Sequence, residues 1–203
     1  MTSGFLLIDK ESGITSSRVV QIIKKKFNFK KVGHLGTLDP MARGLLILAV
    51  NRATKFSSLL LQSKKSYQAE VTLGQQTDTD DAEGEVISNL DVVCNEQEVK
   101  AKLLSFLGES LQFAPAYSAL KHKGKPMYKY ARDGIKVDKE ARKIKIDKID
   151  NISTNLPKVS FNITCSKGTY IRSLTNSFSK CSIENRMLSS AASIIKPISS
   201  FIL

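Results

Sequence analysis

The sequence has no tryptophan, two histidines and three cysteines, and glycine and proline together supply 16 of its 203 residues. So little glycine and proline excludes collagen-like and low-complexity chains. Cys94, Cys165 and Cys181 are odd in number and far apart, which fits neither a disulfide framework nor a CxxC metal site and indicates a reducing compartment. His34 and His122 are widely separated and have no cysteine neighbours, so we expect no metal site.

Long hydrophobic runs are also missing. The longest, at residues 45–50, is far too short to cross a bilayer. The N-terminal residues lack the basic segment, long apolar stretch and small-residue cleavage site of a secretory signal. These absences predict a cytoplasmic protein, of a bacterial cytosol or an organelle interior, without membrane association.

The residues that are present are typical of a folded domain. Hydrophobic residues make up 41% of the chain and charged residues 25%. Strand and helix patterns mix without regular βαβ alternation, and no linker rich in Pro, Gly or Ser divides them. We therefore expect one α+β domain over residues 1–203.

Hydrophobic periodicity places the expected elements. Strands are expected at residues 5–8, 44–50, 67–73, 143–149 and 159–165, and helices at 15–27, 53–61, 96–107, 127–132 and 171–180. The first three helices are expected to bury Val19, Val20, Ile22, Ile23 and Phe27, then Phe56, Leu59 and Leu60, then Val99, Leu103, Leu104 and Leu107. The strand at 5–8 is expected to be buried.

The charge is unevenly distributed. The net charge is +12, yet residues 71–98 carry eight acids and no Lys or Arg, while residues 121–148 carry eleven Lys or Arg against four acids. Five lysines between residues 24 and 31 form another basic cluster, and Tyr128, Tyr130, His122 and Arg132 interleave with the basic stretch. Basic residues beside stacking side chains indicate a nucleic-acid partner, although lysines can also simply solvate a surface.

Two segments could carry chemistry. In the loop at residues 33–40, Pro40 pushes Asp39 toward extended backbone, and apolar neighbours place its carboxylate at the rim of the core. The alternative is that Asp39 only forms a turn before proline. At residues 166–172, a strand meets a helix through Gly168, and Arg172 could hold an anion there, either a carboxylate such as that of Asp39 or a phosphate.

Seven segments in family order together resemble the TruB-type tRNA pseudouridine synthases. They are residues 34–46 (HLGTLDPMARGLL), 10–16 (KESGITS), 53–55 (ATK), 65–67 (KSY), 74–81 (GQQTDTDD), 117–121 (YSALK) and 166–172 (SKGTYIR). The resemblance implies the pseudouridine synthase fold, with a mixed, mostly antiparallel sheet flanked by helices and an RNA cleft across it.

The resemblance also implies the activity, which is isomerisation of the T-loop uridine of tRNA (position 55) to pseudouridine without cofactor or metal. Asp39 corresponds to the nucleophilic aspartate, Arg172 pairs with that carboxylate, and Asp81 completes an Asp-Arg-Asp network. We expect Arg172 to lower the pKa of Asp39. Tyr67 stacks on the flipped uracil and takes part in proton transfer.

Further residues are expected to bind the substrate. The resemblance implies that His34 helps to flip the base, that Tyr170 lines the pocket and that Lys10 supports its floor. Lys121 and Arg132, from the basic stretch, are expected to contact RNA. The expected partner is the T-arm and elbow of tRNA, and the protein is expected to act as a monomer without a protein partner.

Some positions depart from the family pattern. Glu11 stands where the motif has proline, and residues 180–190, including Ser189 and Ser190, match poorly the family segment that follows the arginine. The sequence shows no C-terminal PUA RNA-binding domain, so we expect weaker affinity for the acceptor side of tRNA. Two alternatives stay open, a non-catalytic RNA-binding or tRNA-folding protein and an enzyme that cuts the glycosidic bond of damaged nucleotides.

Overall fold

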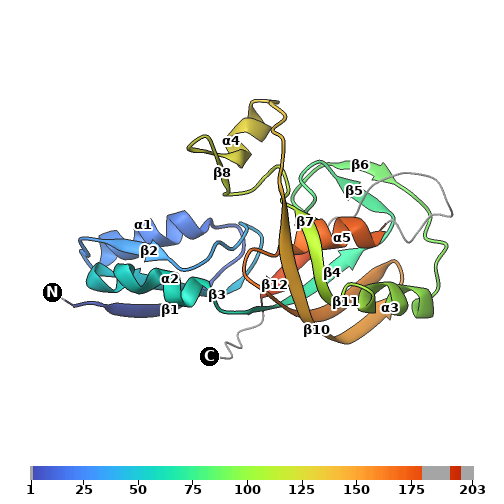
Figure 1. The fold of residues 1–203 in the computed structure, drawn as a ribbon, viewed down its shortest axis with the longest axis horizontal. Coiled ribbons are helices and arrows are strands. Elements are labelled where there is room, and N and C mark those ends of the chain that lie inside the picture. Colours follow the sequence, from blue (N-terminus) through green and yellow to red (C-terminus); the bar gives the residue numbers. More distant parts are fainter. Residues whose placement is uncertain (1, 180–192, 198–203) are drawn as a thin grey trace.

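The computed structural model describes residues 2–179 and 193–197, in which two antiparallel sheets stand side by side (Figure 1). The smaller sheet has the strand order β1-β3-β2 and the larger the order β12-β4-β11-β10-β7. Helices pack on both, and the pairs β5-β6 and β8-β9 form short hairpins. This mixture confirms the α+β fold class.

The smaller sheet is built around a central strand that is covered on both faces. Its strands are β1 (Gly4–Lys10), β2 (Val32–His34) and β3 (Gly44–Val50), and α1 (Ser16–Lys26) packs against it. Leu46 and Leu48 of β3 contact Val19 of α1, while Ile47 and Ala49 point to the opposite face. Because side chains alternate along a strand, the continuous apolar run of β3 supplies both faces.

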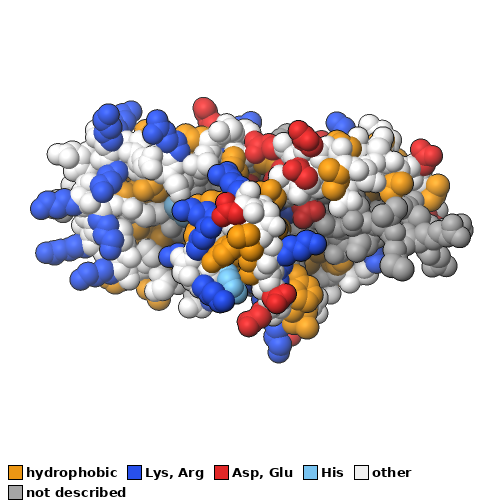
Figure 2. Space-filling model, turned by 90° about the horizontal axis from the view of Figure 1, so that it is seen from above, with side chains coloured by type: hydrophobic (Ala, Val, Ile, Leu, Met, Phe, Trp, Pro, Cys, Tyr) orange, Lys and Arg blue, Asp and Glu red, His pale blue; other side chains and the backbone are white. Residues whose placement is uncertain are grey.

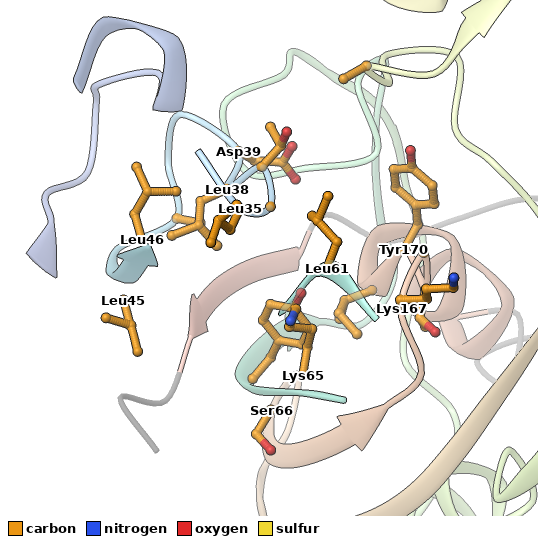
Figure 3. A pocket seen from close by; sticks show the side chains of 18 of the residues that line it. Leu35, Leu38, Asp39, Leu45, Leu46, Leu61, Lys65, Ser66, Lys167 and Tyr170 are labelled. Atoms are coloured by element: carbon orange, nitrogen blue, oxygen red, sulfur yellow. The ribbon is translucent and has the colours of Figure 1, made fainter. Parts of the chain in front are cut away.

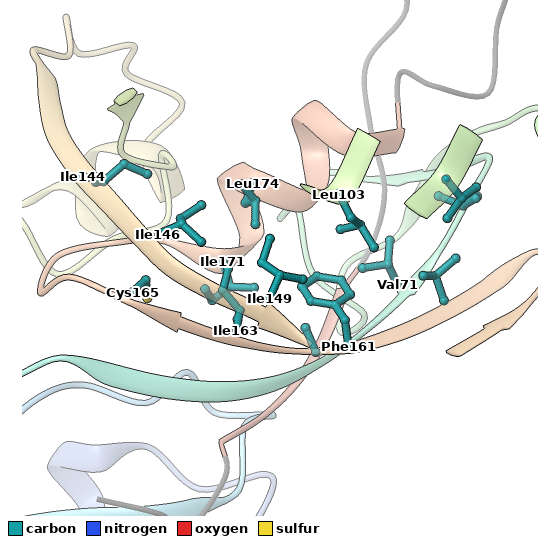
Figure 4. Close-up of a cluster of buried hydrophobic side chains, with 14 of the residues drawn as sticks. Val71, Leu103, Ile144, Ile146, Ile149, Phe161, Ile163, Cys165, Ile171 and Leu174 are labelled. Carbon is teal, nitrogen blue, oxygen red and sulfur yellow. The ribbon is translucent and has the colours of Figure 1, made fainter. Parts of the chain in front are cut away.

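The larger sheet holds the main core. Its strands are β4 (Lys65–Thr72), β7 (Gly108–Phe113), β10 (Ala141–Asn155), β11 (Lys158–Cys165) and β12 (Ser193–Pro197). The helices α3 (Glu96–Leu104) and α5 (Ile171–Ser179) cover one face, where Leu103 and Leu174 point toward Phe161 and its neighbours (Figure 4). Phe161 is 1% exposed, and full burial of such a side chain contributes about 1.5–3 kcal/mol. This packing fixes the start of α5, which carries Arg172.

Shorter elements connect and extend the two sheets. They are the 3-10 helix η1 (Asn51–Phe56), α2 (Ser57–Leu61), β5 (Gln75–Thr77), β6 (Val86–Asn89), β8 (Lys121–His122), β9 (Lys125–Pro126) and α4 (Met127–Arg132). The α4 and β8 region projects from the body of the molecule (Figure 1). None of the helices in the described residues has the length and apolar character needed to span a membrane.

Several expectations about burial were wrong. Ile22, Phe27, Phe56, Leu59, Leu104 and Leu107 are exposed, and β1 alternates, so Phe5 and Leu7 face solvent. Helical spacing identifies the apolar face, but the width of the buried stripe depends on the element packed against it. Strands β6, β7 and β12 were not expected, because their sequences are short or largely polar.

Candidate active site

A cavity of about 280 Å³ lies where the two sheets meet (Figure 3). Its walls include Leu35 and Asp39 from the loop at residues 35–43, Tyr67 from β4, and Tyr170 and Arg172 from the segment that opens α5. Antiparallel pairing of Tyr67 with Ile163 places Tyr67 near the end of β11, from which that segment leaves the sheet. Residues from both sheets are therefore needed to form this cavity.

Hydrogen bonds from the segment at residues 10–16 hold the 35–43 loop in place. The Ser16 hydroxyl donates to the Leu38 carbonyl and accepts from the Leu38 N–H, both at 3.0 Å. The Gly13 N–H donates to the Pro40 carbonyl at 2.9 Å. Bonds on both sides of Asp39 restrict where its carboxylate can lie.

Lys10 is buried beneath this loop, although it carries an ammonium group. It is 1% exposed, and its Nζ donates to the carbonyls of Glu11, Ile14 and Pro40 at 2.7–3.0 Å. Burial lowers the pKa of Lys10, while the negative charges of Glu83 and Asp39 act in the opposite direction. The ammonium thus fixes the backbone next to Asp39 from below the cavity.

Two nitrogens of Arg172 contact the carboxylate of Asp39. Its Nε lies 2.9 Å from Oδ2 and its Nη2 donates to Oδ1 at 3.0 Å. The guanidinium is itself held, because Nη2 also donates to the Tyr117 carbonyl at 2.9 Å and Nη1 to the Thr79 carbonyl at 3.2 Å. With Arg172 only 3% exposed, this two-point contact fixes the orientation of the carboxylate.

Asp81 approaches the same guanidinium from the loop at residues 77–85. Its Oδ2 lies 3.5 Å from Nη1 of Arg172, and its Oδ1 accepts from the Thr79 hydroxyl at 2.8 Å and the Glu83 N–H at 3.1 Å. The loop is tight, since a Cβ added at Gly84 would overlap the Thr79 hydroxyl. Asp39, Arg172 and Asp81 are therefore brought together as one contiguous group.

The pKa of Asp39 departs from expectation. Burial raises it above the ordinary value of 3.8; Arg172 counteracts that rise, and the nearby charge of Asp81 adds to it. The expectation that Arg172 would bring the pKa of Asp39 below its ordinary value is wrong, because the cost of removing the carboxylate from water outweighs the guanidinium. Arg172 is the main group that limits the rise in the pKa of Asp39, and the charge of Lys10 acts in the same direction.

Two tyrosines give the cavity its aromatic surface. Burial, together with Cys165 and Asp39 nearby, raises the pKa of Tyr67, so its ring stays a neutral phenol. Burial also raises the pKa of Tyr170, opposed by a hydrogen bond with Ser118 and by nearby arginines. Such rings can stack on a nucleobase.

Comparison with known proteins places this geometry in a family. The profile "TruB family pseudouridylate synthase (N terminal domain)" matches residues 24–171. The chain belongs to the TruB family. The tRNA pseudouridine synthase B of Burkholderia pseudomallei (strain 668) is 49% identical over 171 residues, which cover 84% of this chain and 57% of that protein. The same-named protein of Alkaliphilus oremlandii (strain OhILAs) is 46% identical over 172 residues.

Solved structures agree with the family. The "Crystal Structure of a Cbf5-Nop10-Gar1 Complex" contains a chain with a TM-score of 0.70 and 28% identity, covering 96% of this chain and 47% of its own length. A chain of the "Structure of H/ACA RNP bound to a substrate RNA containing 2'-deoxyuridine" has a TM-score of 0.66 and 25% identity. Our TruB-family chain spans about 57% of the curated relatives it matches.

The other expected substrate-binding residues of this TruB-family chain lie at the margin of the cavity or beyond it. His34 ends β2 directly before the cavity wall, and its Nδ1 is buried without a hydrogen-bond partner in the described structure. Lys121 starts the β8-β9 hairpin and Arg132 ends α4, stacked 5.6 Å from the Tyr128 ring, so neither lines the cavity. Residues 180–190, with the expected departures at Ser189 and Ser190, lie outside the described residues.

Some supporting residues were missed. Gln112 of β7 donates to the Tyr170 carbonyl at 2.9 Å and accepts from its N–H at 2.8 Å, which holds the segment before Arg172. Ser16 and Thr79 were not singled out for the backbone and carboxylate contacts that they make. The sequence did not indicate a role for Gln112, because the strand that carries it was not predicted. No group of three potential metal ligands occurs among residues 2–179 and 193–197.

Proposed function

We propose that this chain isomerises the T-loop uridine of tRNA, at position 55, to pseudouridine, with Asp39 as the nucleophile. The observation that carries the proposal is the two-point contact of Arg172 with Asp39 at the edge of a cavity lined by Tyr67 and Tyr170. Membership of the TruB family and the names of the curated relatives support it.

The reaction rearranges bonds within one nucleotide. The glycosidic bond from C1′ to N1 of uracil breaks, a bond from C1′ to C5 forms, and the proton lost from C5 is balanced by one gained at N1. The Asp39 carboxylate bonds to the nucleotide as the C1′–N1 bond breaks, and it is released as the C1′–C5 bond forms. Burial raises the pKa of this carboxyl, and Arg172 opposes that rise and so keeps the ionised form accessible.

A uridine inside a folded loop must leave the stack before Asp39 can reach it. We propose that Tyr67 stacks on the extruded uracil, that Tyr170 lines the pocket, and that His34 stacks in the emptied loop. Asp81 positions Arg172, and Lys10 positions the 35–43 loop through Pro40. Lys121 and Arg132, on the projecting region above the cavity, contact the RNA backbone.

The isomerisation is redox-neutral and needs no co-substrate, so we propose that residues 1–203 act as one catalytic domain, as a monomer without cofactor. The proposed partner is the T-arm and elbow of tRNA, in a bacterial cytosol or an organelle interior. Activity of the purified chain alone tests the independence from protein partners.

The test incubates the purified chain, an Asp39→Asn variant and an Asp91→Asn control with an unmodified tRNA T-arm. Asp91 is an exposed acid, so its variant matches the charge change. We expect pseudouridine from the parent and the control but none from Asp39→Asn. Abasic sites in place of pseudouridine would indicate a glycosidase, and bound tRNA without product would indicate an RNA-binding protein; either result overturns the proposal.

A further inference from the structure

The end of α1 furthest from the larger sheet carries a surface that the proposed reaction does not use (Figure 1). Lys24, Lys25, Lys26, Phe27, Lys30 and Lys31 are all exposed there, and we call them the α1-end surface. Figure 2 shows basic side chains gathered at this end of the molecule, while acidic ones concentrate over the other half. The surface is therefore strongly positive and separate from the cavity.

The surrounding sequence makes this positive field almost uncompensated. Residues 12–69 contain eleven Lys or Arg and a single acid, Asp39, whose carboxylate is engaged by Arg172. Arg52 extends the surface, because Asn51, at the start of η1, is hydrogen-bonded to both the N–H and the carbonyl of Lys31. A polyanion is the partner that such a field attracts.

Helix stabilisation explains only part of this arrangement. Lys24, Lys25 and Lys26 occupy the last turn of α1, where cations interact favourably with the helix dipole. Lys30 and Lys31 lie beyond the helix, so the dipole does not account for them. A solvated lysine face also does not account for Phe27, which is 53% exposed among these charges.

Phe27 provides a stacking platform within the basic surface. Its ring is stacked with Phe29 at a centroid distance of 5.8 Å, and the Lys26 ammonium lies 5.8 Å from the ring centroid. An exposed aromatic ring beside several cations is the combination by which proteins hold unpaired nucleotides, with the ring stacking on a base and the cations on phosphates.

The surface lies a short distance along the chain from the proposed active site. Strand β2 begins at Val32, next to Lys31, and ends at His34, so about three residues or about 10 Å of extended chain separate Lys31 from His34. RNA whose target loop occupies the cavity can therefore reach the surface. The stem next to that loop is paired and the other bases of the loop lie beside the cavity, so we assign to Phe27 an unpaired base from outside that stem-loop.

We propose that the α1-end surface is a second RNA-binding site, which holds an unpaired segment of the substrate tRNA outside the T-arm. The proposal rests on the proposed function for the identity of the RNA. It gives the exposed Phe27 and the lysines beyond α1 a common role in substrate affinity, with no part in the chemical step.

The test uses the triple variant Lys26→Gln/Lys30→Gln/Lys31→Gln. The control is Lys100→Gln/Lys148→Gln/Lys158→Gln, which loses the same charge from exposed lysines that pair with acids elsewhere on the molecule. Binding of full-length tRNA is measured at several salt concentrations. We expect the first variant to bind about 10- to 100-fold more weakly at low salt, with a salt slope shallower by about two. Equal losses in both variants would overturn the proposal.

Two further measurements locate the effect. Phe27→Leu, which keeps an apolar side chain but removes the ring, should weaken binding of full-length tRNA by about 5- to 100-fold, the range for loss of one stacked base. Neither Phe27→Leu nor the Lys26→Gln/Lys30→Gln/Lys31→Gln variant should change the affinity for an isolated T-arm stem-loop. The thermal unfolding temperature of both variants should match that of the parent. Equal weakening for the stem-loop would place the contact on the T-arm and overturn the proposal. Binding is measured without turnover, so failure of the proposed function would show separately, as absence of pseudouridine from the parent.

Discussion

The loops at residues 35–43 and 77–85 each bring an aspartate to the same guanidinium, but they prepare the two carboxylates differently. Asp81 accepts hydrogen bonds from the Thr79 hydroxyl and the Glu83 N–H, and its side chain is 10% exposed. Asp39 is contacted within the described part of the chain by Arg172, and its side chain is 28% exposed at the cavity.

This difference is consistent with the proposed roles, in which Asp81 supports Arg172 and Asp39 reacts. One oxygen of Asp81, Oδ1, is occupied by its own loop and the other, Oδ2, faces Arg172, so Asp81 has little capacity left for another group. The loop of Asp39 is held through its backbone, by Lys10 and Ser16, which leaves the carboxylate itself available. The 77–85 loop therefore holds the cation, and the 35–43 loop presents the proposed nucleophile.

Among changes that leave Asp39 in place, replacing the shared cation should have the largest effect on this arrangement. Arg172→Lys keeps a positive charge but cannot make the planar two-point contact or reach all four of its present partners. We expect the rate of pseudouridine formation to fall about 1,000-fold and the free energy of unfolding to fall by about 2–4 kcal/mol. Single-turnover kinetics and urea unfolding measure these; a rate within ten-fold of the parent would show that Arg172 does not orient Asp39.

Moving the nucleophile should cost less than losing its orientation. Asp39→Glu keeps the carboxylate but displaces it by one methylene, and a displacement of about 1 Å can cost about 100-fold in rate. We expect that loss in single-turnover rate with tRNA affinity unchanged. Asp81→Glu makes the same extension in the other loop. Compared with Asp39→Glu, it should lower the rate less and the thermal stability more. The reverse order would contradict the assignment of Asp39 as the reactive carboxylate and Asp81 as the supporting one.

Neutralising Asp81 should weaken the site and also change its pH dependence. Asp81→Asn keeps an acceptor for Thr79 but loses the attraction to Arg172, so we expect about a ten-fold lower rate. Because the charge of Asp81 raises the pKa of Asp39, the acidic limb of the rate profile should move to lower pH in the variant. An unchanged rate would exclude the Asp-Arg-Asp network, and a shift to higher pH would contradict the electrostatics.

The smallest expected effect is on stability. The folded-state pKa of Asp39 is raised above 3.8, so the folded protein binds more protons than the unfolded chain just above that pH, and stability falls as pH rises through the raised pKa. Asp39→Asn has no ionisable group at this position, so its stability does not fall for this reason as the pH rises. Relative to the parent, the variant should therefore be more stable at about pH 7 than at about pH 4, measured by urea unfolding; the opposite trend would mean that Arg172 outweighs burial.

Much of the fold could be predicted from local pattern. The strands at residues 44–50 and 159–165 and the helices expected at residues 15–27 and 96–107 are present, because periodicity and N-terminal capping act locally. Strand β7 was missed, since its alternating sequence is partly polar and its partner in the sheet, β10, is far away in sequence. The exposure of Leu59 depends in the same way on which neighbours reach α2.

The candidate site could be predicted in outline for a different reason. Asp39, Arg172 and Asp81 were grouped by resemblance to a family, since nothing in local physics joins residues so far apart in the chain. The predicted direction of the Asp39 pKa shift was wrong because the pKa depends on the balance of burial against several nearby charges, which only the three-dimensional arrangement fixes. Gln112 binds backbone atoms of Tyr170 and leaves no pattern in the sequence, whereas Ser16 lies in the matching segment at residues 10–16 but its contact with Leu38 could not be read from that match.

The most direct test of the reactive role of Asp39 is the single-turnover rate of pseudouridine formation in Asp39→Asn and Asp81→Asn, measured on the same tRNA at saturating enzyme. We predict that Asp39→Asn forms product at least about 10,000-fold more slowly than the parent while binding tRNA normally. Asp81→Asn should stay within about 100-fold of the parent. If Asp39→Asn is as fast as Asp81→Asn or faster, the 35–43 loop does not present the nucleophile.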